Sequence, residues 1–524
     1  MKSHVRWAAL LLLPLAPALH FIEKNLQLAT PLQVGVVAIL PVVVAVSLFV
    51  LLRLLRLPSL PAISASGVLS FLLFSNRHFR EVIVAFGVPA QESFRLAFQL
   101  PWHILIAGLS AAVYIWIRRR EERAHAVAVF SVVMLVFPVT QLGYAGLRAD
   151  DSADISQGVE IVAAHSPELP HVFVVVLDEY ARADILRDRF GFDNSTFLEA
   201  LRQRGFTVSA RSRSNYTQTQ LSMLSLFSMR HVEGSADGHA DAVAMLHEKF
   251  ARARVWEIFS RMGYRTVVSD SYPFMIKRDA DVVLAGTLSD RLFVDLFLQG
   301  SSWFMTGKVL RGLGISSEAL SREDWMRQLQ QNLDYVEEFA VSEQPVFMFA
   351  HVICPHIPLV LGLPDTVDAE QLYRSDDAIP QGTYRELYPL QVQALNTRVL
   401  NMIDGVLSAS RPVIMLLLSD HGSRLQYAPH TITGTDYDER TAILFAAYTG
   451  EAAASVFPDD ITLVNVFPLI MNTFFDGEWP LQPNTLHYST HDNPLDLRDV
   501  TQEVDRISKL PGKSLSQPTT IAAP

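Results

Sequence analysis

Five apolar runs in the first 150 residues constrain the fold of this 524-residue chain more than any other feature. They cover residues 7–21, 34–52, 57–74, 100–117 and 124–144. The second, fourth and fifth contain no Asp, Glu, Lys or Arg, and each is long enough to cross a hydrocarbon core of about 30 Å at about 1.5 Å per helical residue. The third carries Ser and Gly in its middle. We therefore predict a transmembrane domain of about five helices over 1–147, followed by a linker over 148–169.

Basic residues predict the orientation of these spans. Arg53 and Arg56 follow the second run, and three consecutive arginines at 118–120 follow the fourth. Positive residues collect on the cytoplasmic side, so the fifth span is expected to deliver the rest of the chain to the outer face. This predicts a multi-pass protein of the cytoplasmic (inner) membrane with a periplasmic or extracytoplasmic C-terminal domain. A cleavable signal peptide is the alternative for the first run, because Lys2 and Arg6 precede a short apolar stretch that leads to Ala-Pro-Ala at 16–18.

Composition excludes some classes of function. The formal net charge is -11, and the C-terminal part has no extended basic stripe, which argues against a nucleic-acid partner. The single cysteine, Cys354, excludes an intramolecular disulfide. Core burial alone must therefore stabilise the C-terminal domain.

From about residue 170 the pattern changes to short β-branched runs that alternate with helical periodicity. Buried strands are predicted at 171–177, 264–269, 345–351, 413–419 and 441–448. Helices are predicted at 197–204, 255–262, 325–341 and 384–407. The alternation predicts an α/β domain over 170–502 with a mostly parallel sheet and a site at the carboxyl ends of its strands. The apolar stretch 288–324 is predicted either to pack against the membrane domain or to flank the site, and 503–524 is predicted to be disordered.

Two predicted strands end in acidic residues. Asp178 and Glu179 follow HVFVVVL, and Asp420 and His421 follow a second apolar run that ends at Ser419. A carboxylate in this position emerges at the edge of the sheet where ligands bind, and the histidine adds a nitrogen that suits zinc. A strand-end Asp that only caps a turn is the alternative for either position taken alone.

Thr219 begins a short predicted helix, and Ser222 and Ser225 follow it at steps of three. Helix capping is the ordinary role of such a threonine. The N-terminus of a helix also favours a phosphate group, and a neighbouring divalent cation would lower the pKa of the hydroxyl enough to make it a nucleophile.

Two histidines, His351 and His356, follow another predicted strand in the segment HVICPHIP. A structural role is the alternative for such a pair. Cys354 lies between them, and we interpret it as a small apolar residue of the core and not as a metal ligand.

At these four places the chain resembles the alkaline phosphatase/sulfatase superfamily, and within it the membrane-bound phosphoethanolamine and phosphoglycerol transferases. The resemblance covers about 170–475. It implies that Asp178 or Glu179 is the first metal-binding acid, that Thr219 is the nucleophile and a metal ligand, and that Asp420 and His421 are the later ligand pair. It also implies that His351 and His356 contact substrate phosphate or a second metal, with His356 a candidate hydrogen-bond donor or acid. His430 is the candidate for a further histidine that often follows the Asp-His-Gly motif.

Because a threonine cannot be oxidised to the formylglycine of sulfatases, the resemblance implies phosphoryl chemistry. The implied cofactor is a divalent metal, Zn²⁺ first, with Mn²⁺ or Ca²⁺ as alternatives. The implied donor is a membrane phospholipid, which passes a phosphoethanolamine-type group through a phospho-Thr219 intermediate to an envelope glycan or lipid. Two alternatives stay open, namely a phosphodiesterase or phosphatase of the same fold and a catalytically inactive membrane scaffold.

Overall fold

The computed structural model describes residues 11–25, 31–85, 96–148, 169–235, 242–270, 279–285, 294, 297–298, 301–302, 322–364, 367, 379–450 and 456–508. The chain forms two compact units. The first unit contains residues 1–159 together with 290–319, and the second unit contains 160–289 and 320–524.

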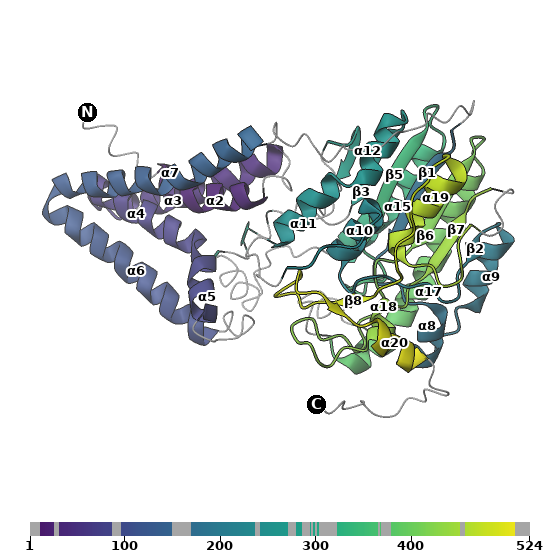
Figure 1. Ribbon diagram of the computed structural model, residues 1–524. Coiled ribbons are helices and arrows are strands. Elements are labelled where there is room, and N and C mark those ends of the chain that lie inside the picture. The colour runs from purple at the N-terminus through teal and green to yellow at the C-terminus, as the bar shows by residue number, and fades with distance from the viewer. Residues whose placement is uncertain are drawn as a thin grey trace. The chain divides into compact units, whose positions relative to one another are not determined.

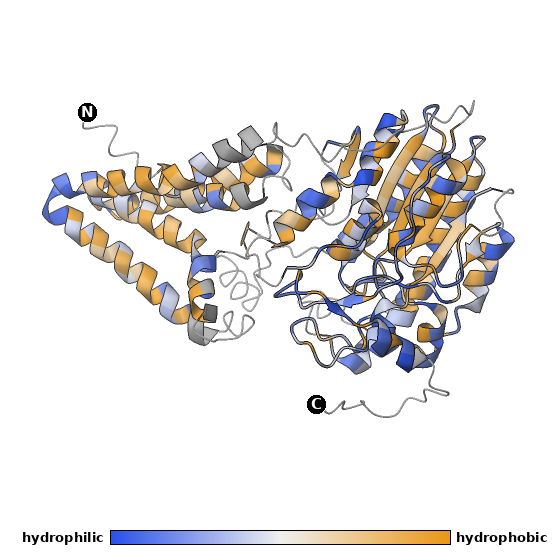
Figure 2. Cartoon of the chain, in the orientation of Figure 1, coloured by the Kyte–Doolittle hydropathy of each residue, from blue (hydrophilic) through white to orange (hydrophobic). Residues whose placement is uncertain are grey.

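Helices make up the described part of the first unit. They are α2 (Leu15–Asn25), α3 (Pro31–Leu54), α4 (Ser59–Phe74), α5 (Asn76–Ala85), α6 (Leu96–Arg119), the short 3-10 helix η3 (Glu121–Arg123) and α7 (Ala124–Arg148). Figure 2 shows apolar residues along α3, α6 and α7, and polar residues where α6 gives way to α7. This distribution is the one that a lipid environment favours.

Three helices among the described residues are long and apolar enough to cross a membrane, at Leu32–Leu54, Gln99–Arg119 and Glu121–Thr140. They correspond to the second, fourth and fifth runs that the sequence predicts. The predicted total of about five spans stays a prediction, because α2 and α4 are shorter and residues 1–10 lie outside the described part.

The Ser and Gly residues of α4 lie inside the first unit. Ser64, Ser66 and Ser70 are buried, and the Ser70 hydroxyl donates a hydrogen bond of 2.6 Å to the Pro41 carbonyl of α3. Small residues let helices approach closely where no water is available to hydrate a gap. The composition that weakens α4 as a lipid-facing span therefore suits it to pack between α3 and α6.

A segment of the later chain belongs to the first unit. Phe297 stacks on Phe74 with ring centroids 5.3 Å apart. The Ser302 amide donates to the Leu73 carbonyl at 2.7 Å, and the Trp102 indole donates to the Ser302 hydroxyl at 3.1 Å. The segment 288–324 was predicted either to pack against the membrane domain or to flank the site. Phe297 and Ser302 pack against the helices of the first unit.

The second unit is built on a sheet in which seven described strands run in the order β2-β7-β6-β1-β5-β3-β4. The strands are β1 (His171–Leu177), β2 (Thr207–Val208), β3 (Arg265–Asp270), β4 (Val282–Ala285), β5 (Val346–Val352), β6 (Val413–Leu418) and β7 (Phe445–Tyr448). β6, β1, β5, β3 and β4 are parallel. At one edge β7 runs antiparallel to β6, and β2 runs antiparallel to β7. The predicted mostly parallel sheet is confirmed.

Helices cover both faces of the sheet (Figure 1). On one face lie α8 (Ala183–Phe190), α9 (Ser195–Gln203), α15 (Arg322–Ala340) and α17 (Gln381–Leu407). On the other lie α10 (Thr219–Ser228), α11 (Ala242–Ala251), α12 (Arg254–Arg261) and α19 (Val466–Phe474). Alternate residues of a strand point to opposite faces, so Phe173, Val175 and Leu177 of β1 enter the first layer while its other valines enter the second.

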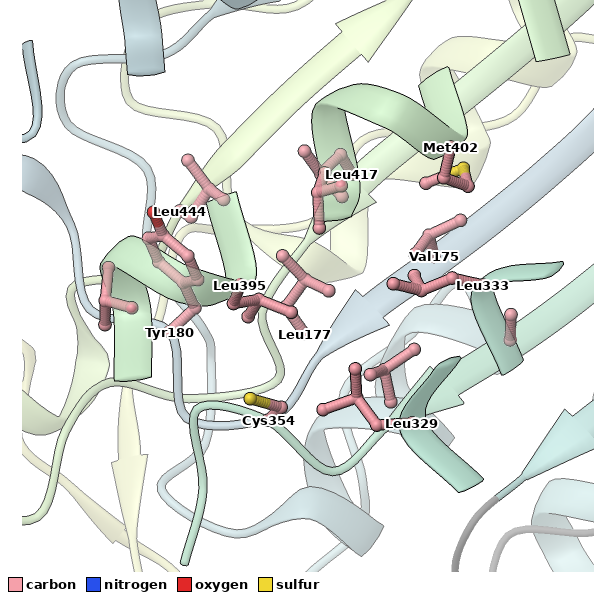
Figure 3. Close-up of a cluster of buried hydrophobic side chains, with 14 of the residues drawn as sticks. Val175, Leu177, Tyr180, Leu329, Leu333, Cys354, Leu395, Met402, Leu417 and Leu444 are labelled. Carbon is pink, nitrogen blue, oxygen red and sulfur yellow. The ribbon is translucent and has the colours of Figure 1, made fainter. Parts of the chain in front are cut away.

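Cys354 lies within the first of these layers, near Leu177 and Leu395 (Figure 3). It is fully buried, and burial raises the pKa of its thiol well above the ordinary value. A thiol in this environment stays protonated and inert. The interpretation of Cys354 as an apolar core residue is confirmed.

Four predicted helices and four predicted strands of the second unit are present within a few residues of their expected ends. The fifth strand is shorter than predicted, because residues 437–441 form a short helix, α18 (Tyr437–Thr441), and only β7 continues as strand. The predicted disorder from 503 is wrong for 503–508, which belong to α20 (Thr501–Ser508). Val504 of α20 is buried against Tyr437 and Tyr488, and this contact holds the helix in place.

The stacked rings of Phe347 and Phe259, 4.0 Å apart, test the core. Phe347→Ala is expected to lower the free energy of unfolding by about 3–5 kcal/mol, because it leaves a cavity in a fully buried layer. The measurement is thermal unfolding of the purified full chain followed by near-UV circular dichroism. Val341→Ala is the control, since Val341 is 76% exposed and its loss should change stability by no more than about 0.5 kcal/mol. Equal midpoints for the two variants would contradict the assignment of the core.

Candidate active site and metal centre

The site lies where three neighbouring parallel strands end. Asp178 follows β1, Asp420 and His421 follow β6, and His351 is the last residue but one of β5. The order β6-β1-β5 places these strands side by side. Residues separated by more than 200 positions therefore meet at one edge of the sheet, as in other open α/β sheets.

A tight turn after β1 ties two of these strand ends together. Glu179 has a φ of 68°, a left-handed conformation that a residue other than glycine adopts only when its surroundings compensate. Its amide donates to Asp420 Oδ1 at 3.1 Å, and the next amide, of Tyr180, donates to Ser419 Oγ at 2.8 Å. The side chains after β6 thus satisfy the backbone of the turn after β1.

The turn and the loop after β6 bring four of the predicted site residues into one cluster. His421 Nε2 lies 3.1 Å from Asp420 Oδ2, 3.7 Å from Asp178 Oδ1 and 3.3 Å from Thr219 Oγ1. Asp178, Asp420 and His421 are buried, and Thr219 is partly exposed. We refer to these four residues as the threonine cluster.

The threonine cluster fits a divalent cation. Asp178 Oδ1 and Asp420 Oδ2 are buried without a hydrogen-bond donor. Ligand atoms about 2.0–2.2 Å from a tetrahedral zinc ion lie about 3.3–3.6 Å from one another, close to the three separations measured from His421 Nε2. His421 Nδ1 lies 3.2 Å from the Gly422 carbonyl, so a proton on Nδ1 leaves a lone pair on Nε2. Arg440 Nη2 lies 3.1 Å from Nε2, and a metal bound there would replace this donor.

Burial and charge act on the pKa values of these residues. Burial raises the pKa of Asp420 to about 6, and the charge of Asp178 adds to the rise. Burial acts on Asp178 in the same direction, but His356, His351 and His421 together hold the pKa of Asp178 below its usual range. Burial, with Arg440 adding to it, lowers the pKa of His421 well below the ordinary value, so His421 is neutral at pH 7. Two neighbouring carboxylates and a neutral imidazole form an electron-rich group that a cation would stabilise.

Thr219 is held by the loop that precedes it. Ser214 Oγ lies 2.8 Å from Ser222 Oγ, and the Asn215 side chain donates to Thr485 O and accepts from Val464 N. Thr219 is the first residue of α10, where backbone N–H groups lack partners within the helix. A fixed hydroxyl at a helix N-terminus is placed to attack a phosphorus atom whose oxygens those N–H groups stabilise.

Glu179 belongs to a second cluster that sequence reasoning missed. Its carboxylate is fully buried and accepts hydrogen bonds from Arg424 Nε, at 3.0 and 2.9 Å to its two oxygens, and from the Tyr384 hydroxyl at 2.6 Å. Arg440 Nη1 lies 3.5 Å away, and Arg424 Nη2 lies 2.6 Å from His356 Nε2. We refer to Glu179, His356 and Arg424 as the arginine cluster.

The three other histidines predicted near the site, His351, His356 and His430, have different surroundings. His351 is buried and its Nε2 lies 3.4 Å from Asp178 Oδ2, so its contact is with a proposed ligand. His356 Nε2 faces Arg424 in the arginine cluster. His430 lies 3.2 Å from Asp492 on an exposed surface and belongs to neither group of described residues that could hold a metal.

Little in the sequence indicates that Arg424 and Arg440 are site residues. Arg424 follows His421 by three residues in the same loop, and a basic residue so close to a ligand motif is a reason to inspect it. Arg440 has no such motif, and its position depends on α18. Its guanidinium donates to the carbonyls of Thr217 and Gly422 and lies 4.0 Å from the centre of the Tyr427 ring.

Steric constraints explain why the residue after Asp420 and His421 is a glycine, Gly422. A Cβ on Gly422 would lie 2.0 Å from the Glu439 carbonyl oxygen and 2.8 Å from that of Ala442. Glu439 in turn accepts hydrogen bonds from Ser423 Oγ, Leu425 N and Gln426 N, and so fixes the loop that carries Arg424. The close approach of Gly422 to α18 therefore helps to position both clusters.

Comparison with known proteins finds no matching protein-family model and no matching curated protein. Several solved structures are similar to the chain. The C-terminal periplasmic domain of EcEptC from Escherichia coli, in complex with Zn, has a TM-score of 0.42 at 12% identity and covers 65% of this chain and 95% of that one. Lipooligosaccharide phosphoethanolamine transferase A from Neisseria meningitidis, an integral membrane protein, has a TM-score of 0.38 at 15% identity and covers 89% and 94%. A phosphonate monoester hydrolase of Agrobacterium radiobacter has a TM-score of 0.37 at 9% identity and covers 61% and 80%.

The structures found include phosphoethanolamine transferases and a member of the alkaline phosphatase superfamily, the groups that the sequence motifs resemble.

Gly422→Ala tests the contact with α18. The added methyl group must displace the Glu439 carbonyl, so the variant is expected to unfold at a lower temperature and to bind Zn²⁺ about 10- to 100-fold more weakly than the wild type. Gly382→Ala is the matched control, because nothing lies within 4 Å of its added Cβ and alanine favours the helix that contains it. Zinc titration and thermal unfolding of both variants make the comparison. Unchanged zinc affinity in Gly422→Ala would show that this contact does not support the site.

Asp178→Asn tests the ligand assignment. The variant keeps the shape of the side chain but loses the charge, and it is expected to weaken Zn²⁺ binding by more than about a hundredfold. Asp188→Asn, the same substitution at a surface position paired with Arg187, should leave binding unchanged. Metal content after dialysis against dilute zinc, measured by inductively coupled plasma mass spectrometry, distinguishes the two. Full zinc content in Asp178→Asn would remove Asp178 from the ligand set.

Proposed function

We propose that this protein is a membrane-bound, metal-dependent transferase that moves a phosphoethanolamine-type or similar phospho-alcohol group from a phospholipid to an envelope glycan or lipid. The observation that carries the proposal is the position of the Thr219 hydroxyl, 3.3 Å from His421 Nε2 and beside two buried carboxylate oxygens that have no donor. A divalent cation held beside this hydroxyl would activate it as a nucleophile.

Asp178, Asp420, His421 and Thr219 are the proposed metal ligands. Two carboxylates, an imidazole and a hydroxyl suit Zn²⁺ or Mn²⁺, and the imidazole makes the set less suited to Ca²⁺. A bound divalent cation would lower the pKa of the Thr219 hydroxyl and offset the charge on the phosphate oxygens. Glu179 is not among the proposed ligands, because its carboxylate is already hydrogen-bonded to Arg424 and Tyr384.

The proposed reaction has two displacements at phosphorus. In the first, Thr219 Oγ1 bonds to the phosphorus of the donor, the bond from phosphorus to the lipid oxygen breaks, and diacylglycerol leaves with a proton. In the second, an acceptor hydroxyl oxygen bonds to phosphorus, the bond to Thr219 breaks, and Thr219 regains a proton. The N–H groups at the start of α10 stabilise the phosphate oxygens in both steps.

Each of the two histidines after β5 has a proposed role. His351 orients Asp178, because it is buried and contacts that carboxylate, and it acts as a positioning residue. His356 lies on the partly exposed side, next to Arg424, where a substrate phosphate would approach. In this arrangement the Arg424 side chain supplies positive charge for that phosphate.

The location also belongs to the proposal. Three apolar helices of spanning length support a membrane-embedded enzyme with a lipid donor. The arginines at 118–120, where α6 ends, support a cytoplasmic position for that turn. The second unit is then on the periplasmic or extracytoplasmic side of the cytoplasmic membrane.

Replacement of Thr219 tests the nucleophile. With head-group-labelled phosphatidylethanolamine, the wild-type protein is expected to release diacylglycerol and to carry label on a peptide that contains Thr219. Thr219→Ala should lose both, with turnover reduced by more than about a thousandfold, whereas Thr219→Ser should retain part of the activity. Thr207→Ala, in the edge strand β2, is the control and should behave as the wild type.

The products of the same assay separate the alternatives. Label on an added lipid or glycan acceptor supports a transferase, and label free in solution supports a hydrolase of the same fold. A wild-type protein without bound metal and without turnover would instead support an inactive scaffold. Label found only on wild-type peptides that lack Thr219 would contradict the proposed phospho-Thr219 intermediate.

A further inference from the structure

Two groups of described residues have the composition and spacing to hold a metal ion, and they share Asp178. One contains Asp178, Asp420 and His421 of the threonine cluster. The other contains Asp178, Glu179 and His356, whose ligand atoms lie within 4.8 Å of one another. The two groups differ in what already surrounds their ligand atoms.

The oxygens of Glu179 are saturated with donors. One accepts from the Tyr384 hydroxyl at 2.6 Å and from Arg424 Nε at 3.0 Å. The other accepts from Arg424 Nε at 2.9 Å and lies 3.5 Å from Arg440 Nη1. By contrast, Asp178 Oδ1 and Asp420 Oδ2 have no donor. A metal ion at Glu179 would have to displace a guanidinium, whereas a metal ion between Asp178 and Asp420 would displace none from those two oxygens.

The nitrogen of His356 is engaged in the same way. Arg424 Nη2 lies 2.6 Å from His356 Nε2, and His356 Nδ1 lies 2.5 Å from the Ile357 carbonyl oxygen. An imidazole that donates from Nδ1 has one lone pair, on Nε2, and Arg424 uses it. His356 Nε2 therefore accepts from Arg424, and His421 Nε2 likewise lies 3.1 Å from Arg440 Nη2. The two groups thus differ in their carboxylate oxygens and not in their imidazoles.

Electrostatics lead to the same conclusion. Two guanidinium groups, of Arg424 and Arg440, face the carboxylate of Glu179, so they already offset the negative charges of Glu179 and of the neighbouring Asp178. A divalent cation here would be repelled by both. The Arg424 side chain is 19% exposed while that of Glu179 is fully buried, so an incoming anion meets the guanidinium before it meets the carboxylate.

We propose that Arg424 takes the place of a second metal ion, so that the site binds one divalent cation, in the threonine cluster, and presents a guanidinium to the transferred phosphate. The inference rests on the proposed function and makes it more specific. Arg424 supplies positive charge to the phosphate from its partly exposed side chain. Glu179 and Tyr384 hold Arg424 in place and are positioning residues.

Zinc stoichiometry of the purified full chain tests this inference. After removal of metal by a chelator, the wild type is titrated with ZnCl₂ by isothermal calorimetry, and bound zinc is counted by mass spectrometry after gel filtration. One equivalent is expected for the wild type and none for Asp420→Ala. Arg424→Ala removes the guanidinium and should bind two equivalents, and the double variant Arg424→Ala/His356→Ala should return to one.

Three further variants control the result. Arg424→Lys keeps a positive charge and should bind one equivalent, and Arg204→Ala, which removes a surface arginine paired with Asp404, should also bind one. Arg424→Gln keeps a hydrogen-bonding side chain without the charge, should bind two, and serves if Arg424→Ala does not fold.

The outcomes separate this inference from the proposed function. Two equivalents in the wild type would overturn the role of Arg424 and leave the metal-dependent function standing, whatever the variants do. One equivalent in a folded Arg424→Ala and Arg424→Gln would overturn it as well. No zinc in the wild type would instead remove the metal on which the proposed function depends.

Discussion

The buried carboxylates of Asp178 and Asp420 are the interaction on which the site depends. Both lie out of contact with water, beside a neutral imidazole, and each has one oxygen without a donor. Such a group is unfavourable unless a proton or a cation offsets the charge. The rest of the domain holds these side chains together against their repulsion. The backbone turn at Glu179, the loop after β6 and the contact of Gly422 with α18 all serve this purpose.

The central position of β1 makes this arrangement stable. β1 pairs with β5 on one side and with β6 on the other, and all of its residues are buried. Its two faces belong to different hydrophobic layers, so the strand cannot shift by one residue without placing Val174 and Val175 in the wrong layers. Because Asp178 follows β1 directly, the fixed register of β1 also fixes the position of the Asp178 backbone. The packing of the core strand next to the site therefore helps to set the separation of the site residues.

The sequence predicted the strand-end residues well because their positions follow from a local pattern. Asp178 and Asp420 each follow an uninterrupted apolar strand, and the edge at which they emerge is fixed by the parallel sheet. Thr219 at the start of α10 was predicted from its helix signal. Arg440 and Tyr384 were not predicted, because each reaches the site from a helix that packs there only in the folded chain. His430 was considered because of its distance along the chain from Asp-His-Gly, yet α18 and its loop direct it to Asp492.

Residues 290–319 belong to the first unit, and this has a consequence for the design of truncated fragments. The polypeptide passes between the two units three times: after α7, before Phe297 and after Ser302. A fragment that starts near residue 160 would keep Phe297 and Ser302 but lose Phe74, Leu73 and Trp102, their partners. Its apolar surface would then be left to detergent or to self-association. A recombinant soluble fragment would need residues 290–319 replaced by a hydrophilic linker.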